Sequence, residues 1–144
     1  MKNKSIEEPK MYFERNTIII LVMACLAIAA DYLGYTILIQ PNPWGIFMAI
    51  FGLVLTIQTL WLILNPYTIV YDDKFEIKQS FFLNKEYFFL DIKSIELNHQ
   101  KMIITYNDLE KDALPLFGMR PSHKQKMFEH LKTHIDLNMI GRDF

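Results

Sequence analysis

Three histidines near the C-terminus come nearest, by type and spacing, to a reactive site. His130 and His134 are four residues apart, a spacing at which two imidazoles on one helix face can share a zinc ion. His123 falls on the same side of the expected helix, but no third matched ligand is visible, and Glu129 precedes His130 outside the order of a zinc-protease motif. We therefore expect no metal site, and interpret His123, His130 and His134 as side chains at the margin of a buried helix face that could respond to pH.

The other motifs that carry chemistry need residues that this chain lacks. It contains no GxSxG turn, no glycine-rich phosphate loop and no paired-carboxylate motif. Because Cys25 is its single cysteine, an intramolecular disulfide or a zinc ribbon cannot form; this residue lies in an apolar stretch. The net charge of −1 gives no electrostatic basis for binding nucleic acid. The sequence nominates no catalytic residue and no cofactor, and predicts a protein that is not an enzyme.

Two polar residues stand out because of their apolar surroundings. Asp31 is the one charged residue between Thr17 and Leu64, and Gln58 lies in the second half of that region. An ionised aspartate at the centre of a membrane helix costs about 2.5–3.5 kcal/mol on insertion scales. We expect Asp31 to be protonated or hydrogen-bonded, to Tyr35 or to a neighbouring chain; a proton-linked or oligomer-contact site is the alternative. Gln58 could join helices by hydrogen bonds in the same way.

Two long apolar segments, 17–39 and 44–64, must hold these residues. As helices they would be about 34 Å and 31 Å long, enough to cross a hydrocarbon core of about 30 Å. The linker at 40–43 (QPNP) contains two prolines, which end the first helix and favour a turn before the second. The two helices therefore run antiparallel as a transmembrane hairpin, which would place Asp31 beside residues 51–52.

Basic residues set the orientation of this hairpin. They lie before the first helix and after the second, and the linker carries none. The positive-inside rule then puts both chain termini in the cytoplasm. The predicted organisation is a cytoplasmic tail at 1–16, a hairpin at 17–64 and a cytoplasmic domain at 65–144. The orienting residues are Lys2, Lys4, Lys10, Arg15, Lys74 and Lys78.

The segment after the hairpin predicts an antiparallel β-meander closed by one helix. Short runs of β-branched and aromatic residues alternate with turn residues. The alternation breaks in the fourth run, where we expect a bulge or bend. A C-terminal helix follows, with Met127, Phe128, Leu131 and Ile135 on one face. The expected strands are 67–71, 74–82, 86–90, 91–97, 102–106 and 112–116, and the helix is 120–137.

Five aromatic residues gather around one hairpin of this meander. Neighbouring residues in a strand point to opposite faces, so these rings cannot all enter one core. Some are expected to face a partner chain, the bilayer surface or the final helix. The candidate interface residues are Phe81, Phe82, Tyr87, Phe88 and Phe89.

The order of elements resembles the pleckstrin-homology (PH)-like superfold, and more narrowly the bacterial PH-like domains that follow one or two membrane helices. The resemblance is carried by 67–77 (YTIVYDDKFEI), 90–96 (LDIKSIE) and 103–106 (IITY). It implies an α+β domain, an antiparallel meander or barrel closed by a C-terminal helix, at the cytoplasmic (inner) membrane of a bacterium. Phosphoinositide-binding members use basic residues around their first hairpin turn. Here that turn is Asp72-Asp73, so we do not expect phosphoinositide binding.

Three functions remain open on this basis. The first is a membrane-anchored binding or scaffold module that self-associates or binds a protein partner. The second is a sensor of a lipid or small ligand in the space between sheet, helix and bilayer. The third is an accessory subunit of a transporter, with Asp31 and Gln58 as intramembrane contacts. A flat aromatic patch on a sheet edge would favour the first, and an apolar pocket with a few convergent polar groups would favour the second.

Overall fold

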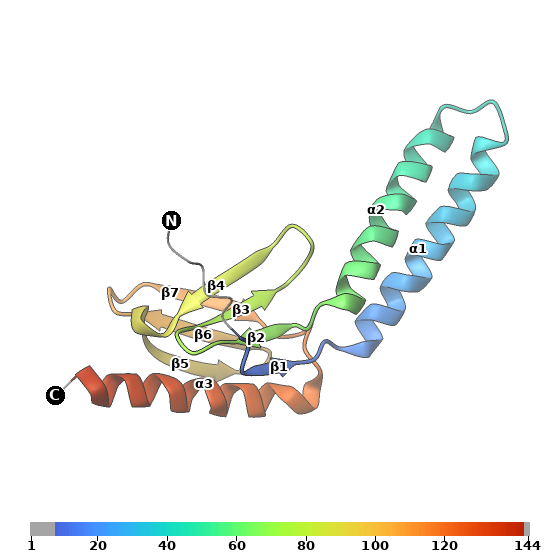
Figure 1. The fold of residues 1–144 in the computed structure, drawn as a ribbon. Helices are drawn as coiled ribbons and strands as arrows, with labels where there is room; N and C mark the ends of the chain where they lie inside the picture. The colour runs from blue at the N-terminus through green and yellow to red at the C-terminus, as the bar shows by residue number, and fades with distance from the viewer. Residues whose placement is uncertain (1–7, 143–144) are drawn as a thin grey trace.

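The structure, a computed structural model, describes residues 8–142. It consists of a two-helix hairpin and an α+β domain with two antiparallel sheets and a C-terminal helix (Figure 1). The hairpin projects obliquely from one end of the domain. The α+β class agrees with the sequence prediction, as does the order of a two-helix hairpin, antiparallel strands and a C-terminal helix.

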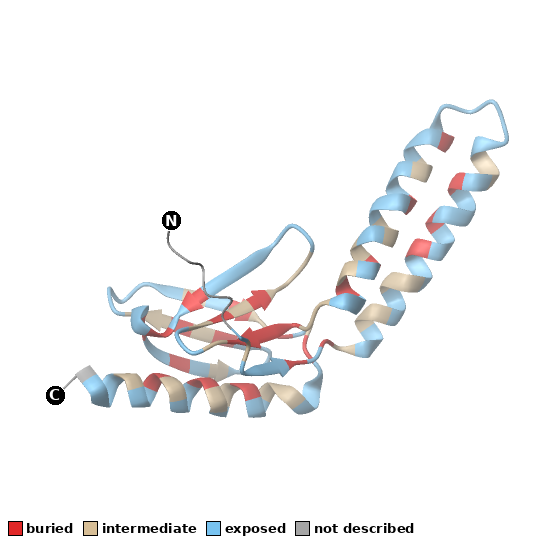
Figure 2. Ribbon diagram, in the orientation of Figure 1, coloured by how far each residue is buried: buried red, intermediate tan, exposed pale blue. Residues whose placement is uncertain are grey.

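The hairpin is formed by α1 (Thr17–Leu38) and α2 (Trp44–Leu64). α1 begins after Asn16, whose side-chain oxygen accepts a hydrogen bond from the Ile18 N–H at 3.1 Å and caps the helix. Both helices are long and apolar enough to cross a membrane. Most of their large apolar side chains point outward, not into a protein core (Figure 2). The two predicted helices are thus confirmed, with α1 ending one residue earlier than expected.

Small residues allow the two helices to pack closely. A Cβ atom added at Gly34 would lie 3.0 Å from the Cα atom of Ala49. One added at Gly52 would lie 3.0 Å from the Asp31 backbone nitrogen and would overlap the Asp31 carboxylate. Asp31 therefore lies beside Gly52, where antiparallel counting places it. Glycine at these positions brings the backbones together, as is common where membrane helices meet.

The first sheet begins before the hairpin and resumes after it. Strand β1 (Met11–Phe13) precedes α1 and pairs antiparallel with β2 (Thr68–Val70), which follows α2. The Tyr67 N–H donates to the Phe13 carbonyl at 2.9 Å, so the chain enters and leaves the hairpin through neighbouring strands. Residues 11–13 belong to the tail in the sequence prediction, whereas in the structure they form an edge strand of the domain. Three residues are too few to show a strand periodicity.

The remaining strands complete two separate sheets in the order β1-β2-β3-β4 and β5-β6-β7. The pairing of β5 with β6 slips between Ile92 and Ser94, which is the bulge that the broken alternation predicts. A short 3₁₀ helix, η1, turns the chain from the first sheet to the second. The bounds are β3 Lys74–Lys78, β4 Asn84–Phe88, η1 Phe89–Asp91, β5 Ile92–Asn98, β6 Lys101–Tyr106 and β7 Lys111–Pro115.

The two sheets do not close into a barrel, so the barrel alternative of the sequence prediction is wrong. Between β4 and β7, side chains make the connection that a strand ladder would make in a barrel. The Tyr87 hydroxyl donates to Asp112 Oδ2 at 2.8 Å, and the Lys85 ammonium lies 3.2 Å from the same oxygen. η1 separates β4 from β5 along the chain, and because these consecutive strands are not paired, the two sheets stay open between them.

The C-terminal helix α3 (Pro121–Arg142) covers the core of the domain and lies beside β5 and η1 (Figure 1). Met127, Leu131 and Ile135 are fully buried at intervals of four residues, so one helix face supplies the cover. This is the predicted face, although the helix continues beyond residue 137. The strands, η1 and the segment after β7 contribute the other fully buried large side chains, which are Phe75, Ile77, Phe89, Ile92, Met102, Ile104, Leu114, Leu116 and Met119.

Candidate functional site

Arg15 holds the junction between the hairpin and the domain. It lies between β1 and α1, and its backbone forms a bridge with Met119. Its Nε–H donates to the carbonyl of Asn65 at 2.9 Å, directly after α2, and an Nη2–H donates to the carbonyl of Lys78 at the end of β3. One side chain thus joins the segment before α1 to the end of α2 and the end of β3. Its aliphatic part and guanidinium are almost fully enclosed, with 7% of the residue exposed.

The guanidinium of Arg15 has no carboxylate partner among residues 8–142. Its two side-chain hydrogen bonds to described residues go to neutral carbonyls and leave three of its five N–H groups uncommitted within that part of the chain. It lies over the rings of Trp61, at 5.0 Å, and Tyr67, at 5.5 Å. Burial away from water lowers the pKa of Arg15 to about 10, so the side chain is still cationic at neutral pH. A buried positive charge without a counter-charge is costly, and it attracts an anion.

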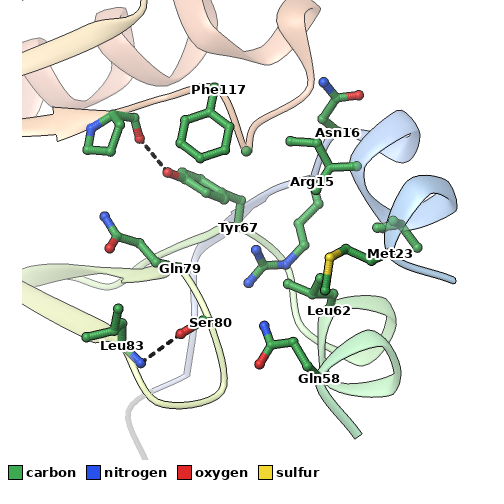
Figure 3. Close-up of a pocket in the computed structure, with 14 residues that line it drawn as sticks. Arg15, Asn16, Met23, Gln58, Leu62, Tyr67, Gln79, Ser80, Leu83 and Phe117 are labelled. Carbon is green, nitrogen blue, oxygen red and sulfur yellow. Dashed lines mark hydrogen bonds between the residues drawn. The ribbon is translucent and has the colours of Figure 1, made fainter. Parts of the chain in front are cut away.

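A cavity of about 320 Å³ opens against this guanidinium. Its walls come from the turns of α1 and α2 nearest the domain, the β3–β4 loop and the segment between β7 and α3 (Figure 3). The walls are almost entirely apolar, and Arg15 is the one charged residue among the described residues that form them. The apolar residues are Ile19, Ile20, Met23, Leu62, Tyr67, Leu83, Pro115 and Phe117; the polar ones are Arg15, Asn16, Gln58, Gln79 and Ser80; Gly118 completes the lining.

Tyr67 fixes one wall of the cavity. Its hydroxyl donates to the Pro115 carbonyl at 2.6 Å, which ties the start of β2 to the end of β7. Burial raises the pKa of Tyr67 to about 12, so the hydroxyl keeps its proton at neutral pH. The ring occupies the space that a side chain at 118 would need, because a Cβ there would lie 2.6 Å from Tyr67 Cε2. Gly118 is therefore required for the ring to reach this position.

The structure separates the five predicted interface aromatics into two groups. Tyr87 and Phe89 are buried, and the Tyr87 ring stacks on Phe75 with centroids 5.0 Å apart. Phe81, Phe82 and Phe88 are exposed. The five rings therefore do not share one face of the hairpin. The two buried rings, Tyr87 and Phe89, face the core and α3. The predicted interface can now involve only the exposed rings, and two of these, Phe81 and Phe82, lie beside α2.

The two intramembrane candidates make different contacts. The Thr56 hydroxyl donates to Asp31 Oδ2 at 2.7 Å, so among the described residues Asp31 is bonded to α2 and not to Tyr35, whereas a contact with a neighbouring chain stays a prediction. Gln58 lines the junction cavity, and its Oε1 accepts the Phe81 N–H at 3.0 Å. Gln58 therefore joins α2 to the β3–β4 loop, whereas Asp31 joins α1 to α2 away from the cavity.

The three histidines do not gather at this site. His123 Nδ1 accepts the Glu14 N–H at 3.2 Å, which ties α3 to the segment after β1. The rings of His130 and His134 are 4.6 Å apart, and His130 Nε2 is buried without a hydrogen-bond partner in the described part of the chain. Burial and the nearby His134 lower the pKa of His130. Within residues 8–142 no group of three possible ligands surrounds these rings.

Sequence reasoning did not identify Arg15 as part of a site. In the sequence it counts only among the charges that orient the hairpin. Its partners at 65 and 78 become neighbours through the pairing of β1, β2 and β3, which one sequence does not reveal. The available signal was its place in the chain, a lone arginine directly before the helix cap at Asn16 and two residues before the long apolar segment.

Comparison with known proteins gives this site no precedent. No protein-family model matches the chain, and no curated protein or solved structure matches it. What the junction cavity can bind must therefore be inferred from its own geometry.

Proposed function

We propose that this chain is a non-enzymatic binding module, anchored in a membrane by its hairpin, that holds an anionic amphiphile in the junction cavity. The observation that carries this proposal is Arg15, a buried cation without a carboxylate partner among the described residues, in the lining of an otherwise uncharged and largely apolar cavity. An anionic head would supply the missing counter-charge, and an acyl chain would fill the apolar part. Both requirements are met by a lipid or a fatty acid.

The size and position of the cavity suit such a ligand. Its volume of about 320 Å³ lies at the lower end of the range for small-molecule pockets, about 300–1,000 Å³. It would hold a head group and the first part of a chain, with the rest of the chain extending along the hairpin. Met23 and Gln58 each lie six residues from the domain-side end of their helix, about 9 Å along the axis. The cavity would therefore reach the depth at which lipid chains begin.

The membrane setting belongs to the same proposal. Basic residues on both flanks of the hairpin favour a cytoplasmic position for both termini, at the inner membrane if the protein is bacterial. Anionic lipids give the cytoplasmic leaflet a negative surface potential, which would enrich suitable ligands near Arg15. The antiparallel sheets with a closing C-terminal helix support assignment to the PH-like superfold. The Asp72-Asp73 turn, where Asp72 pairs with Lys10, does not line the cavity.

Self-association, or binding of a protein partner, is the second candidate function. It is supported by Phe88, an exposed ring on β4, since β4 is the edge strand of the first sheet. The accessory-subunit hypothesis has less support, because Asp31 is hydrogen-bonded within the hairpin and Gln58 to the β3–β4 loop.

Titration with amphiphiles that differ in their head group tests the proposed ligand. The protein, purified in an uncharged detergent, is titrated with phosphatidylglycerol, oleate and phosphatidylcholine, and the midpoint of thermal unfolding is measured. A ligand at 100 times its Kd stabilises the folded state by about 2.7 kcal/mol. We expect a saturable rise in the midpoint with one or both anionic compounds and a smaller one with phosphatidylcholine. The two anionic compounds distinguish a phospholipid from a fatty acid.

Two matched pairs of variants locate the effect. Met23→Trp fills the apolar part of the cavity and should abolish the response, whereas Leu26→Trp, on the exposed side of the same helix, should retain it. Arg15→Gln should weaken the response to anionic compounds, whereas Arg120→Gln removes an exposed arginine that is paired with Glu14 and should not. An equal response to phosphatidylcholine, or a wild-type response in Met23→Trp, would contradict the proposal.

A further inference from the structure

The loop between β3 and β4, residues 79–83, projects beside the end of α2 nearest the domain (Figure 1) and contacts this helix through Phe81. The Phe81 N–H donates to Gln58 Oε1 at 3.0 Å, and the Phe81 ring meets the edge of the Trp61 ring with centroids 6.5 Å apart. Gln58 lies six residues before the end of α2, so the contact is about 9 Å inside the helix at 1.5 Å per residue. If α2 crosses a bilayer, this loop lies at the level of the bilayer beside it.

The loop carries the side chains that such a position requires. The segment from 79 to 83 (QSFFL) contains no charged residue. Phe82 is 77% exposed, and Leu83 is also exposed. The rings of Phe81 and Phe82 pack edge to face, with centroids 4.9 Å apart, so they form one apolar body. Exposed neighbouring apolar residues of this size are unfavourable in water and favourable among acyl chains.

The backbone of the loop is already hydrogen-bonded, which a segment entering hydrocarbon needs. The N–H groups of Gln79 and Ser80 donate to the Leu83 carbonyl at 3.0 Å and 3.1 Å. The Leu83 N–H donates back to the Ser80 carbonyl at 3.3 Å. Together with the hydrogen bond from the Phe81 N–H to Gln58, these hydrogen bonds satisfy most backbone N–H groups of the loop without water. Irregular backbone is tolerated at membrane depth only where its polar groups have such partners.

A second, smaller cavity of about 150 Å³ lies between this loop and α2. Its lining is Val54, Ile57 and Gln58 from the helix and Phe81 and Phe82 from the loop. Val54 lies ten residues before the end of α2, further from the domain than Gln58. The side chains of Val54 and Ile57 belong to the apolar outer surface of the hairpin, so the cavity is continuous with a surface that would face lipid.

We infer that Phe81, Phe82 and Leu83 form a wedge that inserts among the acyl chains next to α2, with one chain occupying the smaller cavity. The wedge and the hairpin would together give the domain two attachments to the same leaflet, which fixes its orientation on the membrane. This inference rests on the hairpin crossing the bilayer, as the proposed function also does. It does not depend on a ligand in the junction cavity, because neither ring of the wedge, Phe81 or Phe82, lines that cavity, although Leu83 does.

Depth-dependent quenching tests the wedge. Cys25 is replaced by Ala, and a single cysteine is introduced by Phe82→Cys or, as the control, by Leu109→Cys. Leu109 is 64% exposed and lies in the turn between β6 and β7, distant in sequence from the wedge. Each protein is labelled with an environment-sensitive fluorophore and reconstituted into vesicles in which some phospholipids carry a nitroxide near the start of one acyl chain. Iodide added to the buffer serves as the aqueous quencher.

We expect the label at 82 to emit at shorter wavelength than the label at 109, and the nitroxide lipid to quench it several-fold more. Iodide should quench the label at 109 more strongly. Equal nitroxide quenching at the two positions would overturn the inference. Shielding of the label at 82 from both quenchers would overturn it as well, because a second protein surface would then cover the loop. If nitroxide quenching occurs and the amphiphile titration fails, only the proposed ligand of the junction cavity is refuted.

Discussion

Tyr87→Phe should destabilise the domain by removing one atom that joins its two sheets. The Tyr87 hydroxyl donates to Asp112 Oδ2 at 2.8 Å, and β4 and β7 share no strand ladder. Hydrogen bonds to a charged group contribute about 1.5–3 kcal/mol. Because Lys85 still contacts the carboxylate at 3.2 Å in the variant, we expect a loss near the lower limit, about 1.5 kcal/mol. For a domain of this size that corresponds to a fall of roughly 6–12 °C in Tm.

The effect should also depend on pH in a defined direction. Burial acts to raise the pKa of Asp112, but the hydrogen bonds from Tyr87 and Lys85 outweigh it and leave the pKa below its ordinary value. A carboxyl with a lowered folded-state pKa stabilises the fold above its unfolded pKa, about 3.9, and this contribution is lost as the pH falls through the folded value. The difference in the free energy of unfolding between wild type and Tyr87→Phe should therefore be largest near pH 7 and shrink below about pH 4.

Denaturant unfolding monitored by circular dichroism at pH 7 and in acid measures both effects. Tyr106→Phe is the matched control, because the structure assigns the Tyr106 hydroxyl no hydrogen bond within the described residues; its change should stay within about 0.5 kcal/mol. A loss below about 0.5 kcal/mol in Tyr87→Phe at pH 7, or a loss that does not shrink in acid, would show that the Tyr87–Asp112 bond does not hold the sheets together.

Three further predictions concern the hairpin and α3. A reporter that is active only outside the cytoplasm should be active when inserted at Asn42 and silent when fused to the C-terminus; the opposite pattern would reverse the orientation. Gly52→Ala should lower the thermal midpoint, because its Cβ overlaps Asp31, whereas Gly141→Ala, with open space around it, should not. Because the folded-state pKa of His130 is lowered, the unfolded chain takes up a proton that the folded chain refuses, and stability should fall as the pH drops below about 6.5. His130→Gln should reduce this fall between about pH 7.5 and 5.5, and an unchanged pH profile would contradict the assignment.

Local pattern was sufficient for the elements whose shape is set by neighbouring residues. The proline turn at 41–43 made the helices antiparallel, and counting along them placed Asp31 beside Gly52, as the structure has it. Strand alternation sent Phe88 and Phe89 to opposite faces, one exposed and one buried. The break in alternation near Ile92 marked a real bulge.

The features that depend on contacts between residues far apart in the sequence could not be predicted from local patterns. β1 is only three residues long, and its partner β2 lies beyond the whole hairpin, so nothing local identifies it. The same pairing assembles the site around Arg15, whose hydrogen-bond partners are 50 and 63 residues away in the sequence. Gln58 was expected to bond another helix, but the loop that it contacts through Phe81 could be placed only with the sheet in view.

The central claim is that the junction cavity holds an anionic amphiphile, and native mass spectrometry tests it most directly. The protein is reconstituted into nanodiscs that contain equal amounts of phosphatidylglycerol and phosphatidylcholine, and is then released in the spectrometer. We predict that wild type retains one anionic lipid and that Met23→Trp retains none, because the tryptophan occupies the apolar part of the cavity. A wild-type spectrum with only the bare protein, or an identical adduct on both proteins, would contradict the claim.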